Sequence, residues 1–116
     1  MSRIIVEEYT SYDSEKRVIS LLDGGFEAHT ARISYNLNKG LPLVEDTDLY
    51  PLILEGTLNN SSVIVHVYSV TAGYGGSGPN AMVNILNAAG FKFENDDILT
   101  DKYADSTGYI HLIFIR

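Results

Sequence analysis

The pattern of apolar and polar positions predicts a chain built mainly from short strands. Residues 26–35 alternate between apolar and polar side chains, as a strand with one buried face does. Other runs are rich in Val, Ile, Tyr and Phe, which favour strands. The predicted strands are Arg3 to Tyr9, Phe26 to Tyr35, Tyr50 to Leu58, Ser62 to Val70 and Tyr109 to Ile115, the third and fourth being joined in a hairpin by Asn59-Asn60-Ser61.

The sequence clearly predicts one helix after Pro79, and it predicts a second, at residues 14–23, that could instead be a strand. Pro79 suits the first turn of a helix, and Gly90 stands where a left-handed residue ends one. Residues 14–23 also have helical spacing, behind an N-cap offered by Asp13-Ser14-Glu15 and ahead of Gly24-Gly25. They also fit a strand that turns at Asp23-Gly24, and the helix is the interpretation we favour. Between Pro79 and Gly90, helical spacing is shown by Ala81, Met82, Ile85, Leu86 and Ala89.

The predicted order of elements indicates the fold class. From Ser62 onward the order is strand, glycine-rich loop, helix, a short strand at Phe91-Lys92-Phe93, and a final strand. This is the order of a split βαβ arrangement of the ferredoxin-like kind. It resembles the order in small regulatory ligand-binding domains of the ACT type, which also have Gly and Pro before the helix, over about half of the chain. We predict one α+β domain over residues 1–116, with a mostly antiparallel sheet of about five strands and one or two helices.

Composition and charge limit the number of domains, the cellular compartment and the kinds of partner that we expect. The 116 residues suit one domain, and the absence of Cys excludes disulfides and thiolate metal sites. At the N-terminus an apolar run of only three residues precedes Glu7 and Glu8, which does not fit a signal peptide. No window approaches the about 20 apolar residues of a membrane span. We expect a cytoplasmic protein without membrane contact. A net charge of −7 disfavours nucleic-acid polymers as partners.

The segment Gly73-Tyr74-Gly75-Gly76-Ser77-Gly78 is the strongest candidate site. Glycine allows close backbone approach, and free N–H groups at a helix start favour a phosphate or carboxylate. Its G-x-G-x-x-G spacing does not indicate a dinucleotide fold, because too little chain follows for two βαβαβ halves. It is not a P-loop, because Pro79-Asn80 stand where Lys and Ser or Thr are needed. The alternative is that these glycines only form a turn. The candidate ligand-binding residues here are Tyr74, Gly75, Gly76, Ser77, Gly78 and Asn80.

A second candidate surface comes from strand alternation. If the strands of residues 62–70 and 109–115 are neighbours, one face carries His66, Tyr68, Tyr109 and His111, and the opposite face is aliphatic and forms the core. Such a polar and aromatic face suits a ligand groove or a subunit interface. The alternative is that this face is covered by the first helix or by a second copy of the chain. Arg32, Lys92 and Lys102 are the basic residues best placed to reach a ligand, and Arg32 is the one we include in the site.

Catalytic and metal motifs are not found. No H-x-H or H-E-x-x-H motif and no nucleophile elbow is present, so we predict no metal, no cofactor and no catalytic set. Two acidic loops carry no calcium-loop spacing and are expected to be solvated. Their acids are Glu45, Asp46 and Asp48, and then Glu94, Asp96, Asp97 and Asp101.

Three functions remain. The first is a non-enzymatic domain that binds or sequesters a small phosphate-bearing ligand such as a nucleotide, in which a subunit interface of a homo-oligomer could take part. The second is a small acidic inhibitor or immunity-type protein that binds a basic protein, which the net charge favours. The third is a small enzyme that uses His66 or His111 as an acid or base.

Overall fold

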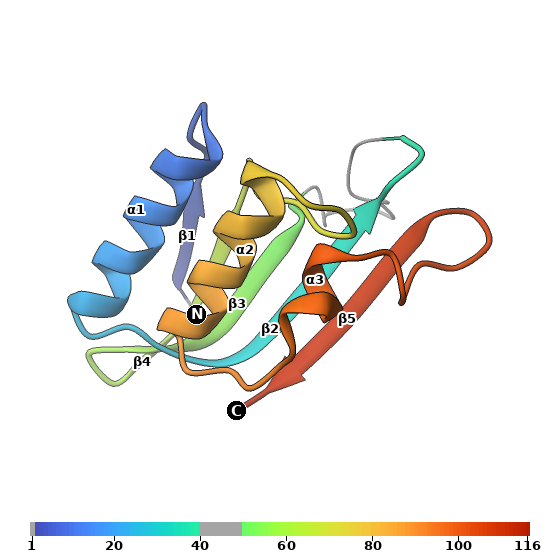
Figure 1. Ribbon diagram of the computed structural model, residues 1–116. Coiled ribbons are helices and arrows are strands. Elements are labelled where there is room, and N and C mark those ends of the chain that lie inside the picture. Colours follow the sequence, from blue (N-terminus) through green and yellow to red (C-terminus); the bar gives the residue numbers. More distant parts are fainter. Residues whose placement is uncertain (1, 40–49) are drawn as a thin grey trace.

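The computed structural model describes residues 2–39 and 50–116 (Figure 1). Within these ranges the chain forms an α+β fold, in which one five-stranded sheet carries all three helices on a single face (Figure 1). The elements are β1 (Ser2–Val6), α1 (Ser11–Asp23), β2 (Glu27–Asn36), β3 (Leu52–Leu58), β4 (Ser61–Val67), α2 (Ser77–Ala88), α3 (Asn95–Leu99) and β5 (Tyr109–Ile115). The predicted fold class is thereby confirmed.

The strand order of the sheet is β1-β4-β3-β2-β5. β1 runs parallel to β4, and the other three neighbouring pairs are antiparallel. β1 and β2 therefore point the same way, with β4 and β3 between them, and α1 connects them across one face. β4 and β5 point in opposite directions and are separated by β3 and β2. The βαβ-like unit thus lies in the first half of the chain, not in the second half, where the element order placed it.

The core lies between the sheet and the helices. Val63, Val65 and Val67 of β4 are buried on the helix side, as their alternation predicted. They belong to one cluster with apolar residues of all three helices. Among the largest fully buried side chains are Ile33, Leu52, Leu54, Met82, Ile85, Leu86 and Ile98. The described residues contain no helix with the length and apolar character needed to cross a bilayer.

Residues 11–23 form helix α1 and not the alternative strand. Thr10 caps this helix, because its hydroxyl accepts the N–H of Asp13 at 3.1 Å. The predicted cap at Asp13-Ser14-Glu15 is therefore about one turn too late. Gly24 and Gly25 end the helix as expected, and Gly25 has a φ of 106°. Val18 is fully buried, so α1 is held mainly by its packing against the core.

Backbone conformations confirm two of the predicted turns. Asn59 and Asn60, with φ of 53° and 64°, join β3 to β4 in the left-handed region that Asn tolerates well. Gly90 has a φ of 87° directly after α2. These positions show where the sequence marks the end of an element most reliably.

The short strand predicted at Phe91-Lys92-Phe93 is not present. The N–H of Phe91 donates to the carbonyl of Leu86 at 3.0 Å and so belongs to the end of α2. Phe93 lies against Phe114 of β5 with 5.8 Å between ring centroids. Its side chain therefore packs on the sheet, although its backbone belongs to no strand. α3 follows, held by a reciprocal capping box between Glu94 and Asp97.

Gly56 on β3 provides a test of the sheet geometry. A Cβ atom at Gly56 would lie 1.8 Å from the carbonyl oxygen of Glu27 on β2, where the register shifts between Ala28 and Thr30. We expect Gly56→Ala to lower the free energy of unfolding by about 2 kcal/mol, because two backbones must separate. Gly75→Ala is the control: a Cβ there meets nothing within 4 Å, so its effect should stay within about 0.5 kcal/mol. Urea denaturation of both variants measures the difference, and equal stabilities would contradict this packing.

Candidate functional site

The segment between β4 and α2 divides into glycines that packing requires and glycines that lie open. Gly73 has a φ of 98°, and a Cβ there would lie 2.5 Å from Ile110 Cδ1. A Cβ at Gly78 would lie 2.1 Å from Thr71 Oγ1. These two glycines are explained by close approach alone. Gly75 has open space around its Cα, so no packing contact accounts for a glycine there.

The start of α2 is electropositive and has no side-chain cap. Gly76 is the N-cap residue and has no side chain to accept a hydrogen bond, and the first turn contains no acidic residue. The N–H of Asn80 donates to the Gly76 carbonyl at 3.0 Å, and Pro79 has no N–H. The N–H groups of Ser77 and Gly78 therefore carry the positive end of the helix dipole without an acceptor among the described residues. This arrangement can accept a compact anion.

Tyr74 lies beside this helix start, is held at its hydroxyl and is partly exposed. Its hydroxyl and that of Thr71 form a hydrogen bond of 2.8 Å, and 41% of the residue surface is exposed. The ring centroid of Tyr74 is 6.5 Å from that of the buried Tyr35. Burial, and then Tyr74, raise the pKa of the Tyr35 phenol above 10.0, so Tyr35 is a neutral support for the Tyr74 ring at physiological pH.

The turn that leads into α1 lies at the same edge of the sheet as the start of α2 (Figure 1). Three hydrogen bonds join the end of β1, this turn and α1 to Tyr68 and Ser69, which directly follow β4. Ser14 Oγ donates to the Tyr68 carbonyl at 2.8 Å, Ser69 Oγ donates to the Glu8 carbonyl, and the Tyr68 N–H donates to the Val6 carbonyl. Ligands of open α/β sheets bind beyond the carboxyl ends of parallel strands, which is where this edge lies.

Sequence reasoning missed the exposed tyrosines at this edge. Tyr9 is 99% exposed in the turn before α1, and Tyr12 is also exposed in the first turn of that helix. The polar stretch around Thr10 was the available signal for a helix start and therefore for an exposed turn before it. Alternation of apolar and polar residues does not show how far a loop residue projects. Tyr9 and Tyr12 are therefore added to the candidate binding residues.

The polar sheet face carries the remaining predicted residues, in separate places. β4 and β5 are not neighbours, so His66 and His111 lie on the same face but three strand spacings apart, about 14 Å. His66 contacts Tyr50, with 5.1 Å between ring centroids, and Tyr68 also contacts Tyr50. His111 stacks on Tyr109, whose hydroxyl lies 3.2 Å from Ser34 Oγ. The two histidines thus belong to different aromatic groups.

Arg32 lies in β2 on the face opposite to the helices, 3.6 Å from Glu55 Oε1 on β3. It alternates with Ala31 and Ile33, which are buried beneath the helices. Its side chain is therefore not directed toward the start of α2. Lys102, another of the three basic candidates, pairs with Asp97, with 2.8 Å between Lys102 Nζ and Asp97 Oδ1.

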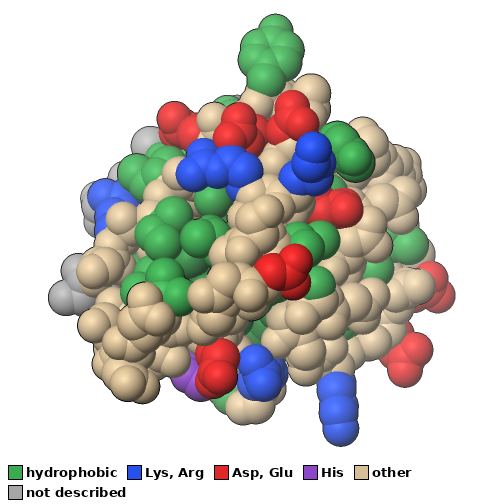
Figure 2. Space-filling model, turned by 90° about the vertical axis from the view of Figure 1, so that its left-hand side faces the viewer, with side chains coloured by type: hydrophobic (Ala, Val, Ile, Leu, Met, Phe, Trp, Pro, Cys, Tyr) green, Lys and Arg blue, Asp and Glu red, His purple; other side chains and the backbone are tan. Residues whose placement is uncertain are grey.

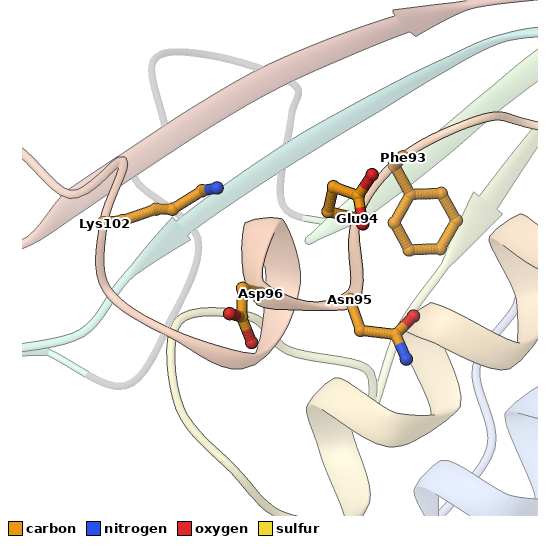
Figure 3. A pocket seen from close by; sticks show the side chains of 5 residues that line it. All are labelled: Phe93, Glu94, Asn95, Asp96 and Lys102. Atoms are coloured by element: carbon orange, nitrogen blue, oxygen red, sulfur yellow. The ribbon is translucent and has the colours of Figure 1, made fainter.

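An open hollow of about 440 Å³ lies beside α3 and includes two of the predicted acids, Glu94 and Asp96, in its lining (Figure 3). Figure 3 shows its side chains pointing in different directions, with no common centre. Within the described residues, no group of three or more His, Asp or Glu side chains could hold a metal ion. The other acidic loop, with Glu45, Asp46 and Asp48, lies outside the described residues. The hollow is lined by Phe93, Glu94, Asn95, Asp96 and Lys102.

Asp97, which pairs with the hollow-lining Lys102, provides a test of the charges beside this hollow. The hydrogen bond from Lys102, with the one from the Glu94 N–H, holds the pKa of Asp97 below 3.8. The stabilisation by this carboxylate is therefore present above pH 3.8 and is lost as the pH falls through the lowered pKa. We expect Lys102→Met to raise the pKa of Asp97 toward its ordinary value, as measured by NMR titration of its side-chain carboxyl carbon. Lys92→Met, which removes an exposed lysine that does not pair with Asp97, is the control, and an unchanged pKa in Lys102→Met would contradict the assignment.

Comparison of the chain with models of known protein families, with curated proteins and with solved structures gives no significant match. Its function must therefore be inferred from the residues and geometry described above.

Proposed function

We propose that the protein is a non-enzymatic domain that binds a small phosphate-bearing ligand, such as a nucleotide, at the start of α2. One observation carries this proposal: the first turn of a 12-residue helix has neither a capping side chain nor an acid, although the chain as a whole has a net charge of −7. Helix starts in proteins are usually capped by Ser, Thr, Asp or Asn. A phosphate would supply the missing acceptor.

The surroundings of this helix start suit a ligand that combines an anion with a planar group. The open position at Gly75 lets a ligand approach the backbone closely, and the exposed part of the Tyr74 ring offers a stacking surface. The proposal uses neither His66 nor His111, which lie three strand spacings apart. A cytoplasmic location, where nucleotides are abundant, is part of this proposal.

A matched pair of variants tests the proposal. Ser77→Asp places a negative charge in the first turn of α2 and should raise the free energy of unfolding by about 0.3–1 kcal/mol through the helix dipole. The same charge should weaken binding of a nucleotide or of inorganic phosphate at least about fivefold, because like charges about 4 Å apart near a surface repel by about 1–4 kcal/mol. Ser77→Asn keeps the shape without the charge and should change binding little.

Thermal shift and titration calorimetry with a panel of nucleotides, sugar phosphates and inorganic phosphate measure both effects. Gly76→Val, whose Cβ would lie 3.2 Å from the Tyr74 ring, should remove the ligand-induced rise in melting temperature. A panel that gives no shift with the unmodified protein, or a shift that Ser77→Asp leaves intact, would overturn the proposal.

The second candidate function is binding of a basic protein through the edge where α1 begins. Figure 2 shows acidic side chains gathered at this end of the molecule, with basic side chains directly below them and a protruding hydrophobic side chain above. Tyr9 is almost fully exposed between Glu8 and the first turn of α1, and exposed tyrosines among charges are typical of protein interfaces.

A double variant separates this function from the first. Tyr9→Ser with Tyr12→Ser should abolish salt-sensitive capture of a basic partner from the native host and leave nucleotide-induced thermal shifts unchanged. Ser77→Asp should have the opposite profile. Capture that persists in the tyrosine variant would contradict this second candidate.

A further inference from the structure

β5 is an edge strand whose outer side carries unpaired backbone groups. The Leu37 N–H donates to the Gly108 carbonyl, and the Arg116 N–H donates to the His29 carbonyl, so even-numbered residues of β5 direct their backbone groups toward β2. Because this direction alternates along a strand, the odd-numbered residues direct theirs outward. Asp105 accepts the Tyr109 N–H and donates its own N–H to the Tyr109 carbonyl. In the described part of the chain, the outward backbone N–H and C=O groups of His111, Ile113 and Ile115 have no hydrogen-bond partner.

This edge lacks the features that usually prevent edge-to-edge pairing. Natural edges are protected by short length, Lys, Pro or a β-bulge. β5 has seven residues without Lys, Arg, Asp, Glu, Pro or Gly, and its register with β2 shows no shift. Its side chains on the polar face include Ile113, 59% exposed, and Ile115, 78% exposed. Unpaired backbone groups and exposed aliphatic side chains thus coincide at two alternate residues, Ile113 and Ile115.

The free groups of β5 are self-complementary under two-fold symmetry. If a two-fold axis passes beside Ile113, Ile113 lies opposite Ile113 of a second copy, and His111 lies opposite Ile115 of that copy. Each of these opposed pairs exchanges two hydrogen bonds, so every outward N–H and C=O group of the three residues is satisfied. The isoleucine side chains of both copies then meet on the polar face.

We propose that β5 pairs antiparallel with β5 of a second copy of this chain, giving a continuous ten-stranded sheet. The neutrality of the segment favours a second copy in particular. Two chains that each carry a net charge of −7 repel one another, and Tyr109–Ile115 is a stretch where they meet without any acid or base facing its like. β1, the other edge, is a poorer partner because it carries Arg3 and is followed by Glu7 and Glu8.

The assembly that results is closed. A two-fold pairing of β5 with β5 uses the same edge in both copies and leaves no second β5 to continue the sheet. The helices of both copies lie on the same face of the joined sheet, and the starts of α2 remain outside the junction. This proposal is therefore independent of the proposed ligand site.

Sedimentation velocity over a range of concentrations tests the pairing. The unmodified protein should sediment as a dimer, and Ile113→Lys should sediment as a monomer at concentrations where the unmodified protein is dimeric, because two ammonium groups would face each other across the axis. Ile5→Lys adds the same charge at an exposed position on the β1 edge and should remain dimeric. Circular dichroism confirms that each variant is folded.

Single-cysteine variants test the register directly, because the chain contains no Cys. Ile113→Cys should form a disulfide-linked dimer on oxidation, since directly opposed residues lie within disulfide reach. A mixture of His111→Cys with Ile115→Cys should cross-link as a mixed dimer, whereas Ile5→Cys should not cross-link. A monomer at all concentrations, a dimer that survives Ile113→Lys, or equal cross-linking at Ile5 and Ile113 would each overturn the proposal.

Discussion

The parallel pairing of β1 with β4 is the constraint on which the rest of the structure depends. Because both strands end at the same edge of the sheet, the helices that follow them begin there side by side and run back over the same face (Figure 1). The hydrogen bond from Ser14 to the Tyr68 carbonyl joins the first turn of α1 to the residue directly after β4. One face of the sheet is consequently aliphatic and covered, while the other keeps the histidines, Arg32 and several tyrosines.

This arrangement separates two surfaces with different chemistry. The edge at the starts of α1 and α2 combines exposed tyrosines with helix dipoles and suits recognition of another molecule. β5 lies at the far end of the strand order, three positions from β4, and offers neutral backbone and isoleucine side chains. A ligand at the first surface and a second copy at the other would not compete for the same residues, so each can be disabled without disturbing its counterpart.

Local patterns predicted the elements well, and long-range arrangement poorly. Alternation identified β5 with its observed limits, and Pro79 with Gly90 identified α2, because both signals act between residues close in sequence. Strand order depends on which edges meet in space, so the separation of His66 from His111 had no local signal. That Arg32 lies on the sheet face opposite to the helices was predictable from its alternation with Ala31 and Ile33. The strand prediction at Phe91 was wrong because its N–H donates to the carbonyl of Leu86 in α2.

The same parallel pair places a demand on folding. Ser2 of β1 lies opposite Val63 of β4, so β1 emerges from the ribosome long before its only neighbouring strand in the described sheet has been made. Contacts between residues so far apart in sequence are formed slowly, because a long loop must be closed first. The meander of β2, β3 and β4 can assemble locally, and β1 can add to it only afterwards. Until then its run of Ile4, Ile5 and Val6 stays exposed to solvent or to a chaperone.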